Sequence, residues 1–206
     1  MSNDQTIGWG IVGCGRVADR RVAPVFSKLD GARLEAVCSR DMAKARTFAS
    51  RHGDPRAYGD LDSLLRDDRV QAVYVATPNA FHAEQAIRCL HAGRHVLVDK
   101  PMAINFDQAN EMVEAARASD RLLAVLHQQR FHPAHQHLLK LVREGKLGKI
   151  NIVRIQIGFW YPPNGNWRLD PALSGGGAAM DLAPHAFDLA LCLAGPIDSI
   201  AARLFH

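Results

Sequence analysis

Apolar and polar positions follow two alternating rhythms through the first 126 residues of the chain. Short apolar runs, typical of buried strands, alternate with segments in which apolar residues recur every three or four positions, as in helices. The predicted strands are 6–12, 33–39, 56–58, 71–76, 95–99 and 122–126, and the predicted helices are 16–28, 42–52, 61–66, 82–92 and 106–119. Strands separated by helices of this length predict the α/β class, with a doubly wound parallel sheet and right-handed crossovers.

Residues at the ends of these segments support the assignment. Asp41 is the expected N-cap of its helix, and Gly53 closes the same segment. Asn105 and Gln108 have the spacing of a capping box, in which the side chain of each residue binds the backbone N–H of the other. Gly93 follows the helix predicted over 82–92, which is the position where a helix commonly ends.

The pattern changes after residue 127. An amphipathic helix is predicted over 133–144, a long alternating strand over 149–159, a helix over 178–193 and the start of a strand over 197–204. Two strands and two helices do not close a domain. We therefore expect two domains, with residues 1–127 forming the first and residues 128–206 the incomplete beginning of the second.

Composition excludes several classes of protein. The chain has 206 residues, 48% of them hydrophobic, and a net charge of +4 from scattered basic residues, which is too mild for a nucleic-acid interface. No apolar run reaches the roughly 18 residues of a membrane span, and the start lacks the features of a secretory signal. The four cysteines are far apart, which is typical of free thiols. We expect a cytoplasmic protein.

A glycine-rich turn follows the first predicted strand and indicates a dinucleotide site. Its pattern is Gly13-x-Gly15-x-x-Ala18, in which the first glycine permits a tight turn and the second lets the backbone approach a pyrophosphate. The small third residue lets the helix pack close to the sheet, and the helix N-terminus favours phosphate. The residues expected to contact the cofactor here are Gly13, Gly15, Arg16, Val17 and Ala18.

The end of the second strand predicts which dinucleotide is bound. An acidic residue at this point would hold the 2′-hydroxyl of NAD, but the chain has Ser39 and Arg40. A hydroxyl and a guanidinium suit a 2′-phosphate, so NADP is favoured over NAD. The alternative is that Arg40 is a solvated loop residue beside Asp41.

Two further strand ends carry polar motifs. Thr77-Pro78-Asn79 follows the strand over 71–76, with His82 one helical turn later, and Asp99-Lys100-Pro101 follows the strand over 95–99. Ligands of open α/β sheets bind beyond the carboxyl ends of the strands. Lys100 is therefore expected at the cofactor crevice, the alternative being a surface lysine made rigid by Pro101.

A third constellation lies on the helix over 178–193. Asp181 and His185 are four residues apart and share one helix face, with Asp188 near it. An imidazole oriented by a carboxylate is suited to proton transfer near neutral pH. The alternative is a pair that only stabilises the helix, and Pro184 is a possible kink.

Together these motifs resemble the Gfo/Idh/MocA oxidoreductase family, which includes glucose–fructose oxidoreductase and inositol dehydrogenase. The resemblance covers nearly the whole chain, and the joint order of the motifs makes it specific. Besides those already named, it rests on Gln129-Arg130-Phe131-x-Pro133, Gly145-x-Leu147-Gly148, Trp167-Arg168 and Gly175-Gly176-Gly177.

The resemblance implies a Rossmann domain followed by an α+β domain built on a large open sheet, and a homo-oligomer. It also implies roles for the motif residues. Lys100, Asp181 and His185 would form the catalytic set. Thr77, Pro78, Asn79, His82, Asp99 and Lys100 would contact the cofactor, and Lys100, Arg130, Trp167, Arg168, Asp181 and His185 would contact the substrate.

The chain departs from the family at two points. The usual glutamate of the Glu-Lys-Pro motif is Asp99 here, so we expect altered cofactor contacts and a retained activity. Family members also continue well past residue 206, which would make this chain a fragment or a shortened form. The missing part would supply most of the second sheet and part of the substrate pocket.

The function expected from these features is hydride transfer between NAD(P) and a secondary alcohol or ketone of a sugar, polyol or related cyclic compound. Two alternatives stay open, a dinucleotide-binding regulator without turnover and an NAD-dependent glycosidase of the same family. A histidine-rich stretch, His127, His132, His135 and His137, has no cysteine or fixed carboxylate beside it, so we expect no metal site.

Overall fold

A six-stranded parallel sheet forms the centre of the computed structural model, which describes residues 6–158, 160–162 and 165–203. The strand order is β3-β2-β1-β4-β5-β6, and every neighbouring pair is parallel, so the predicted doubly wound Rossmann sheet is confirmed. The strands are β1 (Ile7–Val12), β2 (Ala32–Cys38), β3 (Arg56–Tyr58), β4 (Ala72–Val75), β5 (His95–Asp99) and β6 (Leu123–Leu126). The chain reverses its direction of progress across the sheet between β1 and β4, which places a crevice at their carboxyl ends.

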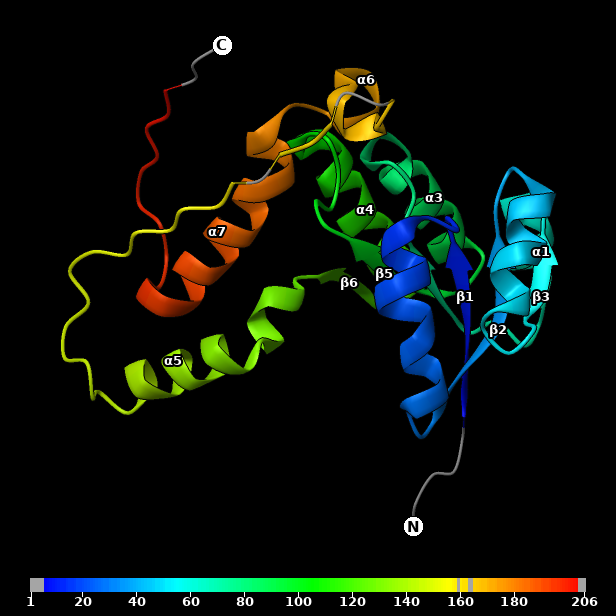
Figure 1. Ribbon diagram of the computed structural model, residues 1–206, viewed down its shortest axis with the longest axis horizontal. Coiled ribbons are helices and arrows are strands. Elements are labelled where there is room, and N and C mark those ends of the chain that lie inside the picture. The colour runs from blue at the N-terminus through cyan, green and yellow to red at the C-terminus, as the bar shows by residue number, and fades with distance from the viewer. Residues whose placement is uncertain (1–5, 159, 163–164, 204–206) are drawn as a thin grey trace.

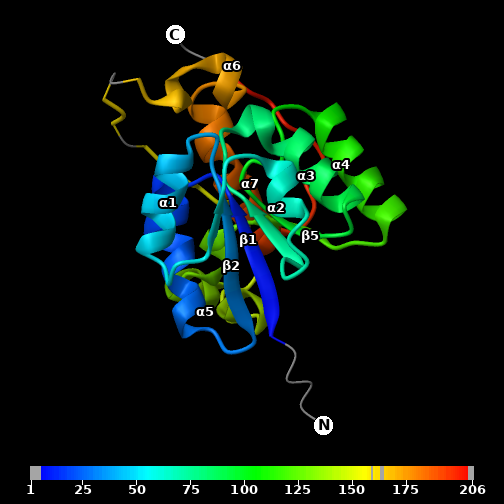
Figure 2. The ribbon, with the colours of Figure 1, turned by 90° about the vertical axis from the view of Figure 1, so that its right-hand side faces the viewer.

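Helices cover both faces of the sheet (Figures 1 and 2). One core joins the sheet to α2, α3 and α4, and a second joins it to η1, η2 and α1. All four residues of β4 are buried, because a parallel strand at the centre is covered on two sides. The helices are η1 (Ala18–Val22), η2 (Ala23–Lys28), α1 (Met42–Ser50), α2 (Leu61–Leu65), α3 (His82–His91) and α4 (Phe106–Ser119).

Two local details differ from the expectations. The helix predicted over 16–28 is helical but irregular, with a π-turn in η1 and 3-10 geometry in η2, where Pro24 has no N–H to donate to the ladder. Only one of the two hydrogen bonds expected of the capping box at α4 is found among the described residues. Asn105 accepts from the N–H of Gln108, but Oε1 of Gln108 is buried without a hydrogen-bond partner among the described residues. Asp41 caps α1 as predicted, through the N–H of Lys44.

The later part of the chain is helical and extended (Figure 1). The two predicted strands over 149–159 and 197–204 are wrong, since their described residues belong to no ladder. The alternating pattern provides a face for a sheet, but a strand also needs a neighbouring backbone, and none of the described strands lies beside these segments. Residues 159 and 204 lie outside the described residues. The elements here are η4 (Gln128–Phe131), α5 (Pro133–Arg143), η5 (Trp167–Leu169), α6 (Pro171–Ser174) and α7 (Ala178–Ala194).

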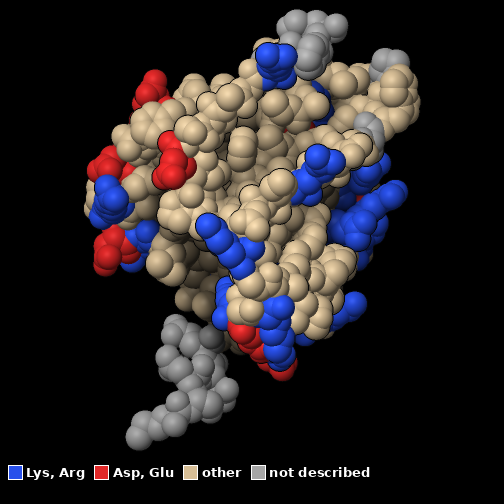
Figure 3. Space-filling view, turned by 90° about the vertical axis from the view of Figure 1, so that its left-hand side faces the viewer, with Lys and Arg blue, Asp and Glu red and all other residues tan. Residues whose placement is uncertain are grey.

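The surface over α5, α7 and the extended segments combines uncharged areas with scattered basic side chains (Figure 3). Figure 3 views this side, and much of it carries no Lys, Arg, Asp or Glu. Large apolar side chains are exposed in this part, including Ile152 at 83%, Trp160 at 81% and Ile200 at 69%. No helix within the described ranges is both long and apolar enough to cross a bilayer.

Candidate active site

The glycine turn after β1 is shaped by its contacts with the neighbouring strands. Gly13 has φ +101°, and a Cβ there would lie 2.7 Å from the backbone of Ala76, so only glycine fits. Its N–H donates to the carbonyl of Cys38 at 2.9 Å. A Cβ on Gly15 would have no atom nearer than 4.0 Å, which leaves its backbone open to a ligand. The turn therefore forms an open cradle at the ends of β1, β2 and β4.

The rest of the turn agrees with the expected packing. Ala18 is completely buried against the sheet, whereas Arg16 is exposed and Val17 half-buried. The N–H of Asp19 donates to the carbonyl of Gly15 at 2.9 Å, which starts the helix directly after the turn. Free backbone N–H groups at such a point favour a phosphate.

At the end of β2, Ser39 and Arg40 border the same crevice. The Oγ atom of Ser39 accepts from the N–H of Asp41 at 3.3 Å. The guanidinium of Arg40 lies 5.4 Å from the centre of the Phe81 ring. Arg40 is exposed and forms no ion pair with the described part of the chain, Asp41 included, so its charge is available to an anion.

The side chains of the Thr77-Pro78-Asn79 motif and His82 bind other parts of the protein. Thr77 donates to Oε1 of Gln85 at 2.7 Å, and Asn79 donates to the carbonyl of Ser174 at 2.8 Å. The ring of His82 is 1% exposed, with Nδ1 2.8 Å from the carbonyl oxygen of Pro101 and Nε2 2.9 Å from that of Thr77. These contacts join the loops that follow β4 and β5. The predicted cofactor contacts of this motif stay a prediction.

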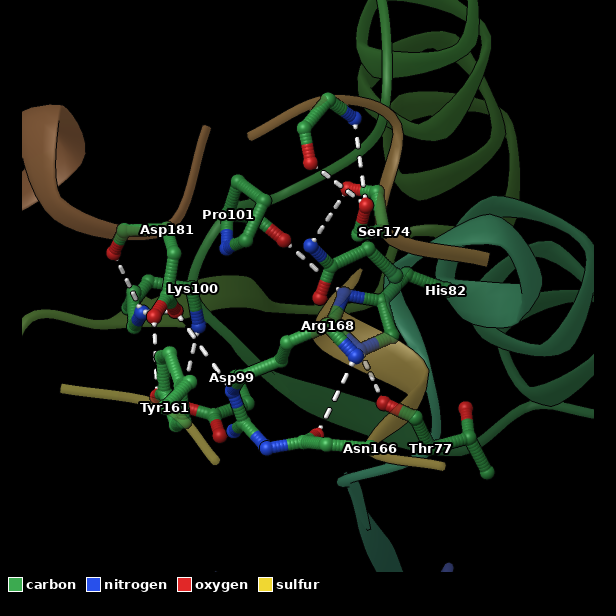
Figure 4. Close-up of polar contacts among 12 residues, drawn as sticks. Thr77, His82, Asp99, Lys100, Pro101, Tyr161, Asn166, Arg168, Ser174 and Asp181 are labelled. Carbon is green, nitrogen blue, oxygen red and sulfur yellow. Dashed lines mark hydrogen bonds and ion pairs between the residues drawn. The ribbon is translucent and has the colours of Figure 1, made fainter. Parts of the chain in front are cut away.

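Lys100 and Asp181 meet at the centre of the site (Figure 4). The Nζ atom of Lys100 lies 2.6 Å from the main-chain oxygen of Asp181 and 2.7 Å from its Oδ1. Tyr161 donates its hydroxyl to Oδ2 of Asp181 at 3.0 Å, and Nε of Arg168 is 3.6 Å from Oδ1. Burial opposes the charge of Asp181, but the hydrogen bond and charge of Lys100 lower the pKa of that carboxyl. Asp181 is therefore a fixed carboxylate.

Asp99 stands where the family resemblance predicts a glutamate, and its side chain binds the backbone of the next residue. Its Oδ1 accepts the N–H of Lys100 at 2.9 Å. Burial raises the pKa of Asp99, and the charge of Lys100 opposes that rise. The side chain of Asp99 therefore helps to hold the backbone of Lys100 in place.

His185 lies one turn after Asp181 on the same face of α7, as the spacing predicts. It is 9% exposed, and its Nδ1 has no hydrogen-bond partner within the described residues. The expected Asp181–His185 hydrogen bond is absent from the described contacts, because the Asp181 carboxylate binds Lys100 and Tyr161. Burial lowers the pKa of His185, and the charges of Lys100 and His127 lower it further. The ring is therefore poised to be neutral and to accept a proton.

Arg130 reaches the same helix face one further turn along. Its Nε lies 2.8 Å from both carboxylate oxygens of Asp188, and Nη2 also contacts Oδ1. Asp188 is 5% exposed, whereas the side chain of Arg130 is about half exposed. Arg168 adjoins the Lys100–Asp181 pair through Asp181, and its guanidinium lies 4.4 Å from the ring centre of Trp167. Arg130 and Arg168 therefore contact Asp188 and Asp181, which lie on α7 on either side of His185 in sequence, and the substrate contacts expected of these residues stay a prediction.

Two residues of this site are not assigned to it from the sequence. Tyr161 belongs to a loop without regular structure, so no periodicity relates it to Asp181. His127 follows β6, and its Nδ1 is 4.0 Å from Oδ1 of Asp188. Its position after a strand end is the signal that could have identified it.

Two other histidines of that stretch, His132 and His135, have separate local partners. Nδ1 of His132 accepts from the N–H of Ala134 at 3.3 Å at the start of α5. Nδ1 of His135 lies 2.8 Å from the carbonyl oxygen of Gln129. No group of three His, Cys, Asp or Glu side chains with the geometry of a metal site occurs among the residues described.

Comparison with known proteins identifies the chain's relatives. Residues 7–127 match the family described as oxidoreductase family, NAD-binding Rossmann fold (GFO_IDH_MocA), and residues 135–206 match the GFO/IDH/MocA C-terminal domain. Oxidoreductase P35 of Formosa agariphila is 35% identical over 203 residues, which cover 96% of this chain and 63% of that protein. The chain thus spans less than two thirds of that relative's length.

Solved structures agree with this assignment. Aldose-aldose oxidoreductase from Caulobacter crescentus, complexed with glycerol, has a TM-score of 0.87 and 33% identity over 93% of this chain and 58% of its own. KijD10, a 3-ketoreductase from Actinomadura kijaniata in complex with NADP and TDP-benzene, has a TM-score of 0.80 and 29% identity, covering 92% and 57%. The WlbA dehydrogenase from Bordetella pertussis, in complex with NADH and UDP-GlcNAcA, has a TM-score of 0.84 and 31% identity, covering 94% and 56%. The glycine cradle, the site and these similarities establish that the chain belongs to the Gfo/Idh/MocA oxidoreductase family.

Proposed function

We propose that the protein transfers a hydride between a nicotinamide dinucleotide and a secondary alcohol or ketone of a sugar, polyol or related cyclic compound. The observation that carries this proposal is the contact of 2.7 Å between Lys100 and Asp181. That pair lies beyond the carboxyl ends of the strands, beside a nearly buried neutral histidine, at the same edge of the sheet as the glycine cradle. A proton acceptor and a hydrogen-bond donor are the two groups that alcohol oxidation requires from a protein.

The residues present fit a dinucleotide. A Cβ on Gly13 would collide with the backbone of Ala76, whereas the space before Gly15 is open. The pyrophosphate would lie on this turn and on the N–H groups of residues 16–18. When bound, the nicotinamide supplies or takes up the hydride. We place the adenosine end at Ser39 and Arg40, because the guanidinium of Arg40, which forms no ion pair among the described residues, suits a 2′-phosphate, and we favour NADP for that reason.

The chain's own groups then have distinct tasks. His185 accepts the proton of the substrate hydroxyl, or returns it to a carbonyl in the reverse direction. Lys100 has three N–H bonds, and Asp181 accepts two of them. The third donates to the same substrate oxygen and stabilises the charge that develops there. Asp181 keeps the amine oriented toward that oxygen, and Tyr161 and Arg168 hold Asp181.

A sugar-like substrate is proposed from the chemistry around His185 and from the relatives. Arg130, Trp167 and Arg168 provide donors and an aromatic face, a combination that suits a polyhydroxylated ring. Aldose-aldose oxidoreductase and the UDP-GlcNAcA complex support the same class of substrate. Specific substrates depend on the individual pocket and not on the fold.

Turnover of a substrate panel tests the proposal. Purified protein is mixed with NADP+ or NAD+ and a set of aldoses, inositols and sugar acids, or with the reduced cofactors and keto-sugars, and absorbance at the nicotinamide band is followed. Saturable turnover that Lys100→Met abolishes is the expected result. Tight cofactor binding without turnover of any compound would instead indicate a regulator. Cleavage of a glycoside with no net cofactor change would indicate the glycosidase branch.

A further inference from the structure

A buried hydrogen bond ties the first part of the chain to the start of α7. The Nδ2 atom of Asn79 donates to the main-chain oxygen of Ser174 at 2.8 Å, across 95 positions of sequence. Asn79 is 4% exposed and Ser174 is 3% exposed. A side-chain amide at such a depth has little access to a ligand outside the protein, so its donor serves the internal contact.

The segment that receives this bond packs closely against Ile104. Gly175 has φ +76°, and a Cβ there would lie 2.5 Å from Cγ2 of Ile104. The hydroxyl of Ser174 donates to the carbonyl of Gly176 at 2.5 Å and accepts the N–H of Gly176 at 3.3 Å. The loop is therefore pressed against Ile104, fastened by Asn79 and stiffened internally.

The position of this loop determines the position of Asp181. Helix α7 begins at Ala178, three residues after Gly175, and Asp181 lies in its first turn. Pro184 lies inside α7 without ending it, so the helix is continuous from Ala178 to Ala194 and carries a displacement of its first turn to the turn that follows. A shift at Ser174 would therefore move both Asp181 and His185.

The other half of the pair is held by a neighbouring residue of the same motif. Nδ1 of His82 is 2.8 Å from the carbonyl oxygen of Pro101, the residue after Lys100. A carbonyl oxygen only accepts, so this contact is a hydrogen bond when Nδ1 carries a proton. Asn79 and His82, three positions apart, thus contact the two segments that carry Asp181 and Lys100.

We propose that Asn79 and His82 are positioning residues that set the Lys100–Asp181 contact from a single turn of chain. The segment 79–82 acts as a brace between the loop after β5 and the loop before α7. The expected effect of this brace on the reaction rate rests on the function proposed above. Its effect on the position of the Lys100–Asp181 contact does not. Displacing a reacting group by about 1 Å can cost 10²-fold in rate, so a loosened brace has a measurable effect.

The arm through Asn79 is tested with Asn79→Ala and the control Ser174→Ala. The control removes a hydroxyl from the same loop but keeps the main-chain oxygen that Asn79 binds. Asn79→Ala is expected to lower kcat about tenfold or more, with the dissociation constants of NADPH and NADH within about twofold of the parent values. Hydrogen exchange in residues 178–185 should accelerate more in Asn79→Ala than in Ser174→Ala, which loses only the local bonds to Gly176.

The arm through His82 is tested with a matched pair of amides. In His82→Asn the amide nitrogen replaces Nδ1 and keeps the donor to Pro101, whereas in His82→Gln it replaces Nε2 and keeps the donor to Thr77. We expect His82→Asn to retain most of the parent kcat and His82→Gln to lose about tenfold. The reverse order would overturn the role of His82.

The outcomes separate this inference from the proposed function. If affinity for either dinucleotide falls by the same factor as kcat in Asn79→Ala, Asn79 is a cofactor contact and the inference is overturned. If the parent protein turns over no compound, the proposed function fails. Hydrogen exchange alone then decides whether segment 79–82 positions the start of α7. Faster exchange in Asn79→Ala than in Ser174→Ala then supports the brace, and equal exchange in both overturns it.

Discussion

Lys100 and Asp181 are joined by two hydrogen bonds from one ammonium group, at 2.6 Å to the main-chain oxygen and 2.7 Å to Oδ1. The side chains are 10% and 16% exposed, so solvent screens the pair weakly. A main-chain acceptor ties the amine to the backbone of α7 and not only to a mobile carboxylate. Any displacement of this helix start therefore moves the amine's partner directly.

Replacing Lys100 with methionine removes the donor and keeps most of the side-chain volume. We expect Lys100→Met to lower kcat by about 10²-fold or more, because it deletes a group that stabilises developing charge. Affinity for the dinucleotide should change little. Lys146→Met is the matched control, since Lys146 is exposed and pairs with Glu144 at 2.8 Å away from the site. Equal kcat values in the two variants would contradict the role of Lys100.

His185 provides a prediction for the pH dependence of alcohol oxidation. Its pKa is lowered by burial first and by the charges of Lys100 and His127 next. A base must be unprotonated, so the acid limb of the kcat profile should lie below the ordinary histidine value of about 6.5. His185→Ala should lower kcat by about 10²–10⁴-fold and remove that limb. Near-normal turnover in this variant would exclude the proton-transfer role.

His127 should influence that limb without taking the proton itself. Its positive charge lowers the pKa of His185, so His127→Gln removes one cause of the shift. The pKa of His185 then rises, and the acid limb of kcat moves to higher pH. Rate measurements across pH 5 to 8 in both proteins reveal the displacement. A limb that stays in place, or moves to lower pH, would contradict this electrostatic coupling.

Arg40 distinguishes the two dinucleotides. If its guanidinium binds the 2′-phosphate, Arg40→Ala should weaken NADP binding by about 1–3 kcal/mol and leave NAD binding nearly unchanged. Fluorescence titration of both reduced cofactors against parent and variant measures this difference. Equal losses for the two cofactors would show that Arg40 supports the crevice in another way.

Asp67 gives a prediction about stability. Its carboxylate is 2% exposed and binds Nη2 of Arg69 and the hydroxyl of Tyr58, each at 3.0 Å. The hydrogen bond from Arg69 is the largest cause that lowers the pKa of Asp67 to about 2, against an opposing contribution from burial. Because the folded value lies below the unfolded value of about 3.9, the stabilisation is complete above pH 4 and is lost as pH falls toward 2.

We expect Asp67→Asn to lower the free energy of unfolding by about 2 kcal/mol at neutral pH, with a smaller difference near pH 3. Urea unfolding at both pH values measures it. Asp198→Asn, at an exposed position, is the control. A pH-independent loss in Asp67→Asn would attribute the effect to packing rather than to the carboxylate's charge.

The apolar side chains around Ile152 and Ile200 give a prediction about association. Exposed apolar surface beside extended segments without strand partners favours self-association. We expect residues 1–127, expressed separately, to bind dinucleotide and to remain monodisperse at concentrations where residues 1–206 associate. Light scattering on both proteins tests this difference. Equal scattering by the two proteins would show that this apolar surface does not cause association.

The sequence predicts elements well where local rules decide them. The strands of the sheet and the N-caps Asp41 and Asn105 follow from short stretches of chain, because hydrophobic period and capping act within a few residues. The strand predicted over 149–159 fails for a different reason. Alternation describes which face a strand presents, but hydrogen-bond partners come from elsewhere in the chain.

The candidate site is predictable in its residues and not in its connections. Lys100 follows a strand end and Asp181 has helical spacing with His185, but nothing local relates positions 81 residues apart. Competition decides the partner, since the ammonium of Lys100 outcompetes the neighbouring imidazole for the Asp181 carboxylate. Tyr161 comes from an irregular loop, so its hydrogen bond to Asp181 could be found only from the folded structure.

The strand order has a consequence for how the molecule is made. Every strand of the sheet precedes residue 127, and the glycine turn directly follows the first of these strands. Asp181 emerges more than fifty positions after the last strand. Chains fold in the order of their synthesis, with N-terminal units first. The nascent protein therefore acquires its cradle for a dinucleotide, and Lys100 beside it, before it possesses Asp181 and His185.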